Sequence, residues 1–172
     1  MTCIVFSSTY NESGKVDALA KSINNSLNNL NVNSTYINVG QLELPICDGY
    51  TCYKDPKVIE LQQQTKQADG FIFCSPIYNY DVNAICKNLI ELCGQSFIDK
   101  PIGVAVVAGG TRSYMAPLSF INSIMIDFRC LVIPRFIYAT NADFNKKNEI
   151  INQDISDRII TLSSAYKKLE NV

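Results

Sequence analysis

Short apolar runs alternate along the chain with longer segments whose apolar residues recur every three or four positions. The short runs are typical of buried strands, and the longer periodic segments are typical of amphipathic helices. The predicted strands cover residues 2–6, 35–39, 71–74, 102–107 and 131–138, and the predicted helices cover residues 16–30, 57–68, 83–97, 114–128 and 151–169. Pro134 predicts an interruption or an edge position for the last strand, because proline has no N–H group to donate.

Five strand–helix units in succession predict an α/β fold, in which helices cover both faces of a parallel sheet. Two doubly wound strand orders are common, and five strands favour the flavodoxin-like doubly wound five-stranded parallel sheet over the Rossmann arrangement. We expect a single domain over residues 1–172, because the chain contains no linker and no internal repeat. Ligands of such sheets bind beyond the carboxyl ends of the strands, so the loops after the first, third and fourth strands are expected to carry the chemistry.

The first loop, residues 7–14, is rich in hydroxyl and amide side chains. Its candidate cofactor-binding residues are Ser7, Ser8, Thr9, Tyr10, Asn11, Ser13 and Gly14. Hydroxyl groups and free N–H groups at the start of a helix suit a phosphate monoester. A polar turn in which Asn11 or Ser13 caps the helix is an equally good interpretation. The loop has neither a Gly-x-Gly-x-x-Gly nor a Walker pattern, which argues against an NTP or a dinucleotide bound in the Rossmann manner.

Two further loops follow the third and fourth predicted strands. The candidates are Pro76, Ile77, Tyr78, Asn79 and Tyr80 in the hairpin loop, and Ala108, Gly109, Gly110 and Thr111 in the glycine loop. Aromatic rings and an amide at a strand end can border a flat heterocycle, and paired glycines let such a ligand approach the backbone closely. Each loop alone also fits an ordinary turn. Three such loops at adjacent strand ends favour a binding site.

These motifs resemble those of the NADPH-dependent FMN reductase family. The resemblance spans about residues 1–138 and rests on Ser7, Ser8 and Ser13, on Ser75-Pro76-x-Tyr78-Asn79 with Lys87-Asn88 downstream, and on Gly109-Gly110-x-Arg112. It implies a flavodoxin-like fold, FMN as the cofactor, NADPH or NADH as the reductant, and a homodimer or homotetramer in which a neighbouring subunit helps to close the site. It also implies that Ser8 and Ser13 hold the phosphate, that residues 76–79 border the isoalloxazine, and that residues 109–111 contact its pyrimidine edge.

The chain departs from the family pattern at several positions. Ser7 and Tyr10 stand where the family often has glycine and arginine, so the usual cation at the phosphate is missing. Ile77 replaces a residue that is often acidic, and residues 81–84 lack the proline and glycine that usually precede the helix. These differences bear on the choice between NADH and NADPH more than on the flavin.

Composition and cysteine content limit the expected partners, location and metal content of the protein. The chain has 47% hydrophobic residues, 18% charged residues and a net charge of −1, so neither nucleic acid nor a membrane surface is an expected partner. The seven cysteines form no Cys-x-x-Cys pair and no basic apolar leader precedes the first strand, which predicts reduced thiols and a cytoplasmic location. Cys47 and Cys52 lie where iron–sulfur relatives of this fold carry a cluster, but a four-iron cluster needs about four thiolates, and we expect no metal site.

The sequence contains no histidine, so the commonest general base is absent and the chemistry is expected to come from a cofactor. We predict an NAD(P)H-dependent FMN-containing oxidoreductase that passes electrons from the nicotinamide through FMN to a small acceptor, namely a flavin, a quinone, an azo compound or a metal ion. No side chain is assigned as a catalytic residue. One alternative is a flavodoxin-type electron carrier without NAD(P)H activity, which would usually be strongly acidic. Another is a module that kept the fold and lost the flavin.

The helix predicted over residues 83–97 is apolar on more than one side. One stripe holds Ile85, Leu89, Leu92, Cys93 and Phe97, and Cys86 and Ile90 lie off it. A helix of this kind has more than one buried face, so we expect one face on the sheet and the face around Ile90 on a second subunit. Tyr80 and Asp81 would then lie near the neighbouring flavin. The alternative is a large monomer core that covers both faces.

Overall fold

The structure is a computed structural model that describes residues 1–169, so residues 170–172 of the expected single domain lie outside the described part. The strands are β1 (Thr2–Ser7), β2 (Asn33–Asn38), β3 (Gly70–Tyr78), β4 (Asp81–Val82), β5 (Pro101–Ala108), β6 (Leu131–Val132) and β7 (Ile137–Thr140). The α-helices are α1 (Lys15–Asn29), α2 (Pro56–Gln67), α3 (Ala84–Cys93), α4 (Pro117–Phe128) and α5 (Gln153–Lys168). Short 3-10 helices are η1 (Val39–Leu42), η2 (Cys52–Lys54), η3 (Gly94–Ser96), η4 (Thr111–Ser113) and η5 (Asn141–Asp143).

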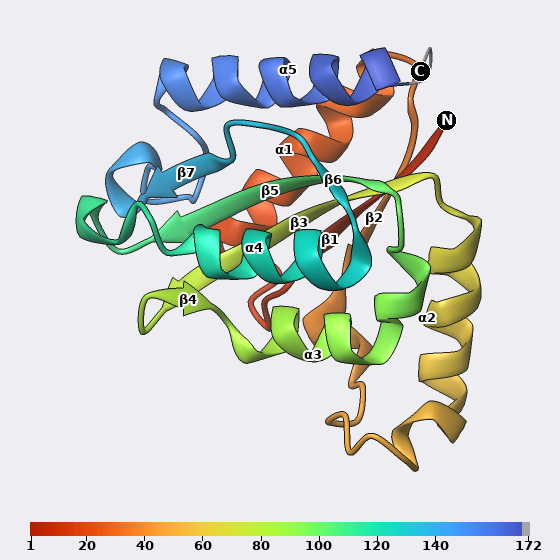
Figure 1. The fold of residues 1–172 in the computed structure, drawn as a ribbon. Coiled ribbons are helices and arrows are strands. Elements are labelled where there is room, and N and C mark those ends of the chain that lie inside the picture. The colour runs from red at the N-terminus through yellow and green to blue at the C-terminus, as the bar shows by residue number, and fades with distance from the viewer. Residues whose placement is uncertain (170–172) are drawn as a thin grey trace.

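The strands form one sheet in the order β2-β1-β3-β5-β6, with β7 also paired to β5 and β4 paired to β3 (Figure 1). All of these pairings are parallel except the β3–β4 hairpin. With β6 and β7 counted as one position, this is the flavodoxin strand order. The predicted α/β, flavodoxin-like fold is confirmed.

The predicted strand count was wrong, because the sheet has seven strands among the described residues rather than five. β4 is an additional strand of two residues that folds back on the end of β3. The strand predicted over residues 131–138 is split into β6 and β7, because Pro134 has no N–H for the ladder and Arg135 has a φ of 65°. Both pieces pair with β5, one with its start and the other with its end.

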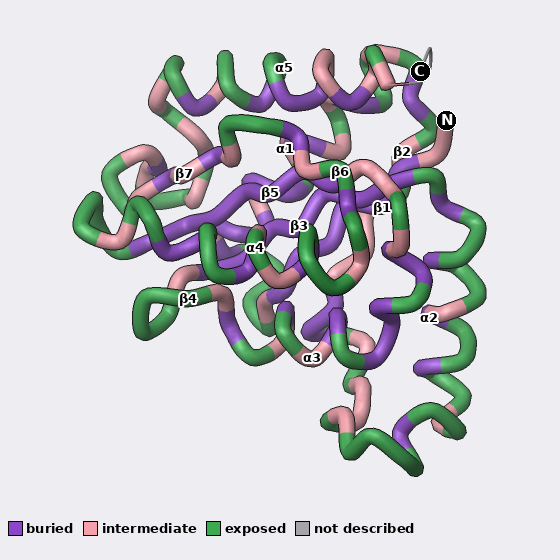
Figure 2. Tube along the Cα trace, in the orientation of Figure 1, coloured by how far each residue is buried: buried purple, intermediate pink, exposed green. Residues whose placement is uncertain are grey.

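Helices cover both faces of the sheet, and each face has its own core (Figures 1 and 2). Alternate residues of β1 point to opposite faces: Val5 joins the core under α1 and α5, and Phe6 joins the core under α2, α3 and α4. In the second core the Phe97 ring packs edge-on against Phe71 and Phe73, with ring centroids 4.8 and 5.3 Å apart. No helix within the described residues is both long enough and apolar enough to cross a membrane.

The expectation that Ile90 of α3 meets a second subunit was wrong. Ile90 is only 4% exposed and Cys86 only 1%, and both belong to the core between the sheet and the helices. α3 is also covered from the side of α2, where Gln62 Nε2 donates to the carbonyl of Leu92 at 2.7 Å. The monomer core therefore covers both apolar faces of α3, as the alternative interpretation held.

The predicted helix over residues 114–128 starts later, at Pro117. Proline is favoured in the first turn of a helix because its missing N–H would have no intrahelical acceptor there. Residues 114–116 form a turn between the short η4 helix and α4 instead. This places Tyr114 and Met115 in the connection between the glycine loop and α4, where both side chains are about half exposed.

Candidate functional site

The three candidate loops leave neighbouring strands at the same edge of the sheet. The parallel register aligns Ser7 of β1 with Cys74 of β3, and Pro76 of β3 with Val107 of β5. The first loop, the hairpin loop and the glycine loop therefore lie next to one another beyond the carboxyl ends of β1, β3 and β5. This is the edge at which doubly wound sheets bind ligands.

A buried asparagine joins the first loop to the hairpin loop. Asn83 Nδ2 donates to the carbonyl of Ser8 at 2.7 Å, and its Oδ1 caps α3 by accepting from the N–H of Cys86 at 3.0 Å. The Asn83 N–H also donates to the Ser75 hydroxyl at 3.2 Å. Sequence reasoning did not include Asn83 in the site, although an asparagine directly before a helical segment is a favoured N-cap.

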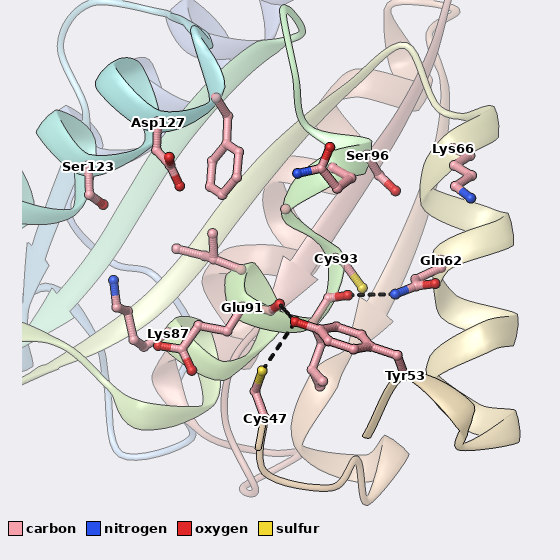
Figure 3. Close-up of a pocket in the computed structure, with 15 residues that line it drawn as sticks. Cys47, Tyr53, Gln62, Lys66, Lys87, Glu91, Cys93, Ser96, Ser123 and Asp127 are labelled. Atoms are coloured by element: carbon pink, nitrogen blue, oxygen red, sulfur yellow. Dashed lines mark hydrogen bonds between the residues drawn. The ribbon is translucent and has the colours of Figure 1, made fainter. Parts of the chain in front are cut away.

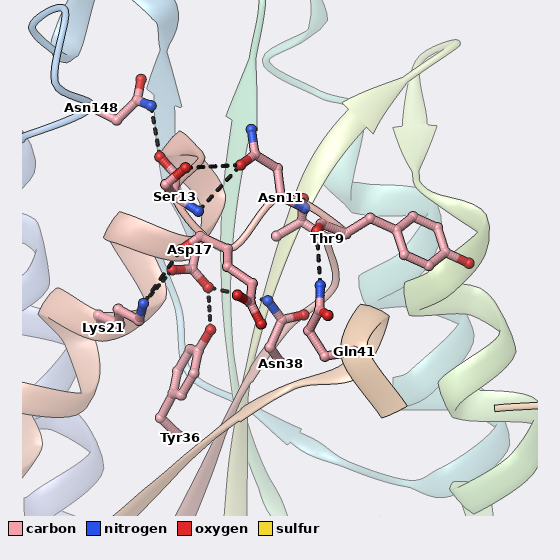
Figure 4. A network of polar contacts seen from close by, with 11 residues as sticks. Thr9, Asn11, Ser13, Asp17, Lys21, Tyr36, Asn38, Gln41 and Asn148 are labelled. Atoms are coloured by element: carbon pink, nitrogen blue, oxygen red, sulfur yellow. Dashed lines mark hydrogen bonds and ion pairs between the residues drawn. The ribbon is translucent and has the colours of Figure 1, made fainter. Parts of the chain in front are cut away.

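The first loop is held in part by bonds within itself (Figure 4). Thr9 Oγ1 accepts from the N–H of Asn11 at 3.1 Å, and Asn11 Oδ1 lies 3.2 Å from both the N–H and the hydroxyl of Ser13. From the far end of the chain, Asn148 Nδ2 donates to the carbonyl of Ser13 at 2.7 Å. These bonds hold the backbone in a turn around the start of α1.

The connection after β2 packs against the backbone of the first loop. A β-carbon on Gly40 would lie 2.2 Å from the carbonyl oxygen of Thr9, so this close approach requires glycine. Next to it, Gln41 Nε2 donates to the carbonyl of Tyr10 at 2.8 Å. The Tyr10 side chain is 74% exposed. Ser13 lines a cavity of about 770 Å³, and Tyr10 lines another of about 310 Å³.

The predicted serines occupy different environments. Ser8 is buried, and its hydroxyl donates to the carbonyl of Cys74 at 2.7 Å, which ties the first loop to β3. The Ser7 hydroxyl is also buried and has no hydrogen-bond partner among the described residues. Ser13 is exposed at the start of α1. Of the three hydroxyls, that of Ser13 is the one open to a ligand arriving from solvent.

The N-terminus of α1 has no side-chain cap at Gly14, so N–H groups of its first turn are available to an anion. Asp17 of the same turn is buried, but Lys21 Nζ pairs with its carboxylate at 2.7 Å, and Tyr36 and Asn38 donate to it from β2 (Figure 4). Burial and the Asp17 carboxylate raise the pKa of the Tyr36 hydroxyl, which therefore remains a donor. Asp17 is thus neutralised and does not oppose an anion at the start of the helix.

The hairpin loop has an unusual backbone. Asn79 and Tyr80 form its turn with φ angles of 50° and 66°, and two central residues with positive φ are typical of a type I′ turn. Tyrosine rarely adopts this conformation, and such strain is concentrated at ligand sites. The Tyr78 and Tyr80 side chains are 61% and 56% exposed. The Ser119 hydroxyl of α4 donates to Asp81 Oδ1 at 2.8 Å and anchors the hairpin.

The glycine loop presents bare backbone to open space. A β-carbon on Gly109 or Gly110 would have no heavy atom within 4 Å. Gly110 has a φ of −166°, which any residue can adopt, so its backbone conformation does not require glycine. The Tyr138 hydroxyl donates to the carbonyl of Gly110 at 2.6 Å and holds the loop in place. The backbone of the two glycines is therefore open to a flat ligand, and this open backbone fits the ring of FMN.

Comparison with known proteins agrees with this geometry. The sequence model of the NADPH-dependent FMN reductase family matches residues 1–144. The chain belongs to this family. The expected resemblance to this family is therefore confirmed.

The identity to individual relatives is below 30%. An NAD(P)H-dependent FAD/FMN reductase of Geobacillus thermodenitrificans is 29% identical over 126 residues, which cover 70% of this chain and 66% of the relative, just under two thirds of its length. An NADPH azoreductase of a Bacillus species is 23% identical over 135 residues, with coverages of 74% and 76%. Among solved structures, an apo NADH:FMN oxidoreductase superposes with a TM-score of 0.80 at 13% identity, over 98% of this chain and 89% of the other. The last likeness shows the shared fold.

A side chain added at the glycine loop should block flavin binding without unfolding the protein. We expect Gly110→Val to weaken FMN binding about tenfold or more, the loss produced by about 1–3 kcal/mol of overpacking against the ring. Gly110→Ala should give an intermediate loss, and neither variant should change the unfolding temperature, because the space is open in the free protein. Fluorescence titration with FMN and thermal unfolding measure the two effects. Wild-type affinity in a folded Gly110→Val variant would remove this loop from the site.

The exposed Ser13 hydroxyl should distinguish FMN from riboflavin. Because only FMN carries a phosphate, Ser13→Ala should weaken FMN binding about tenfold, as expected for one hydrogen bond to a charged partner, and leave riboflavin binding unchanged. Ser26→Ala, further along α1, is the matched control and should affect neither ligand. Paired titrations of both flavins measure the ratio. An equal loss for both flavins would contradict the placement of the phosphate.

Proposed function

We propose that the chain is an NAD(P)H-dependent FMN reductase that passes electrons to a small acceptor: a flavin, a quinone, an azo compound or a metal ion. The observation that carries this proposal is the open space over Gly109 and Gly110, at the same edge of the sheet as the uncapped start of α1 and the two exposed tyrosines of the hairpin loop. A phosphate site after β1 and an open backbone after β5, with the hairpin loop of β3 between them, match the two ends of FMN.

Each loop has its own role in this proposal. The Ser13 hydroxyl and the first-turn N–H groups of α1 hold the phosphate, while the buried Ser8 positions the first loop through β3. Residues 76–80 border the ring, and the backbone of residues 108–111 contacts its polar edge. When bound, FMN accepts a hydride from the nicotinamide and releases electrons to the acceptor. The protein's contribution is position and access, which agrees with a chain that contains no histidine.

Two observations favour an enzyme over a flavodoxin-type carrier. The chain has 16 acidic and 15 basic residues, so it lacks the strong negative field that steers a carrier to its partners. The similarity to an FAD/FMN reductase and to an NADPH azoreductase supports a small-molecule acceptor and makes an azo compound a useful first substrate. The cytoplasmic location stays a prediction.

The proposal is tested with the protein loaded with FMN. We expect NADH or NADPH to bleach the oxidised-flavin absorbance under anaerobic conditions, and subsequent addition of a quinone or an azo dye to restore it. Stopped-flow absorbance measures both half-reactions, and steady-state NAD(P)H oxidation measures their sum. FMN binding without bleaching by either nicotinamide would indicate the carrier, and an absence of FMN binding would indicate a module that has lost its flavin.

We also propose a homodimer that is built on α4 rather than on α3. The exposed face of α4 carries apolar side chains at helical spacing: Leu118 is 40% exposed, Met125 49% and Ile126 73%. Met115, just before the helix, extends this surface and is 52% exposed. Because Ser119 ties α4 to Asp81, a twofold partner on this face would lie beside the hairpin loop. A tetramer would require a second interface.

Disruption of this face should couple assembly to activity. We expect the wild type to sediment as a dimer and Ile126→Glu to sediment as a monomer with reduced NAD(P)H oxidation, because a carboxylate cannot be buried unpaired in an apolar interface. Ile160→Glu on α5, where the side chain is 56% exposed, is the matched control and should stay dimeric and active. Analytical ultracentrifugation at micromolar concentration measures the state. A fully active monomeric wild type would exclude the proposed dimer.

A further inference from the structure

Two cysteine sulfurs meet in the connection between β2 and α2. Cys47 Sγ and Cys52 Sγ lie 3.9 Å apart. The segment between them is folded by Asp48, whose carboxylate accepts from the N–H groups of Tyr50 at 2.9 Å and Cys52 at 3.0 Å and from the Thr51 hydroxyl. These bonds hold the pKa of the Asp48 carboxyl well below its usual range. The turn that brings the sulfurs together is therefore built by the segment itself.

Cys47 differs from the other cysteines in its access to solvent. Cys3, Cys52, Cys74, Cys86, Cys93 and Cys130 are buried, and Cys47 is partly exposed. Cys47 lines a cavity of about 570 Å³ beside α3, into which a small oxidant can enter (Figure 3). No third metal-ligating side chain joins the pair to form a metal site within residues 1–169. The two sulfurs are therefore close enough for a small movement to join them in a disulfide.

We propose that Cys47 and Cys52 form a reversible disulfide when the protein meets hydrogen peroxide. The Cys47 thiolate attacks one peroxide oxygen, the O–O bond breaks, and the products are a Cys47 sulfenic acid and hydroxide, which takes up a proton to give water. The Cys52 sulfur then attacks the sulfenic sulfur, the S–O bond breaks, and the second water leaves with the Cys52 proton. Peroxide is reduced by two electrons and the two thiols are oxidised. A thiol reductant restores the dithiol by exchange.

The order of the two cysteines follows from their surroundings. Burial raises the pKa of the Cys52 thiol, and the nearby Asp48 carboxylate adds to this effect, so Cys52 stays protonated until it resolves the sulfenic acid. The Cys47 sulfur lies 3.5 Å from the Tyr53 hydroxyl, which donates to the carbonyl of Glu91 at 3.3 Å (Figure 3). Contact with Cys47 raises the pKa of Tyr53 to about 12. The phenol therefore keeps its proton and can turn it from Glu91 to the Cys47 thiolate, which makes Tyr53 a positioning residue.

The disulfide would stiffen the connection next to the first loop. The Cys47 N–H donates to Asn88 Oδ1 at 2.8 Å, and Asn88 Nδ2 donates to the carbonyl of Pro45 at 3.0 Å, so α3 holds the other side of this connection. The preceding residues Leu44 and Ile46 line the 310 Å³ cavity that Tyr10 also borders. Oxidation therefore acts on a wall close to the first loop.

The test counts thiols in the folded protein, with and without added FMN. We expect peroxide to remove two of the seven thiols and the intact mass to fall by two hydrogen atoms. Tyr50 lies between the two cysteines, so chymotryptic cleavage after Tyr50 separates their peptides unless a disulfide joins them. Cys52→Ser should stop at a sulfenic acid on Cys47 that dimedone traps. In Cys47→Ser, no thiol should be lost at the rate at which the wild type loses its two thiols.

Two matched variants make the outcome specific. Cys93→Ala removes a buried cysteine of the same cavity and should leave disulfide formation unchanged. Tyr53→Phe should slow alkylation of Cys47 about tenfold, the size expected for loss of a hydrogen bond to a charged partner. Retention of all seven thiols, or a disulfide that maps to other cysteines, would overturn the proposal. Disulfide formation needs no flavin. A protein that binds FMN but forms no disulfide would contradict only this proposal, and a protein that forms the disulfide but binds no FMN would contradict only the proposed function.

Discussion

The parallel hydrogen bonding of β1, β3 and β5 is the constraint on which the rest of the structure depends. It aligns Ser7 with Cys74 and Pro76 with Val107, so segments that are far apart in the sequence end at one level. A slip of one residue would turn every side chain of a strand to the opposite face. Both cores specify the register, because alternate residues of β1 are buried on both sides of the sheet. The binding edge is therefore positioned by the interior of the protein.

Short polar contacts then fix the loops at this edge. The Asn83 amide bonds to the first loop and caps α3, and the Ser8 hydroxyl bonds to the carbonyl of Cys74. Both groups are buried, where a hydrogen bond left unmade would cost about 1–3 kcal/mol. Gly40 lets the connection after β2 support the first loop from below, and Tyr138 holds the glycine loop. The site is thus largely formed before a ligand binds, which reduces the entropy that binding must overcome.

The departures from the family pattern have structural counterparts. Residues 81–84 lack the proline and glycine that usually precede the helix, and here Asn83 caps the helix with its side chain. Tyr10 replaces the usual arginine, and the anion site that we propose consists of the Ser13 hydroxyl and the uncapped first turn of α1. The charge of Asp17 in that turn is neutralised by Lys21. The phosphate site that we propose therefore depends on dipoles and a hydroxyl instead of a cation.

The sequence alone determined the α/β class, the flavodoxin-like strand order and the three loops, because apolar periodicity and turn residues report local structure and which faces are buried. It also carried the family motifs from Ser7 to Arg112. Tertiary structure decided what depends on distant segments: that Ile90 is buried, that Ser8 is internal while Ser13 is open, and that Asn83 joins two loops. It also brought Cys47 and Cys52 together through the turn around Asp48. Burial and hydrogen-bond partners are properties of the packed chain, and the spacing of residues along one segment does not contain them.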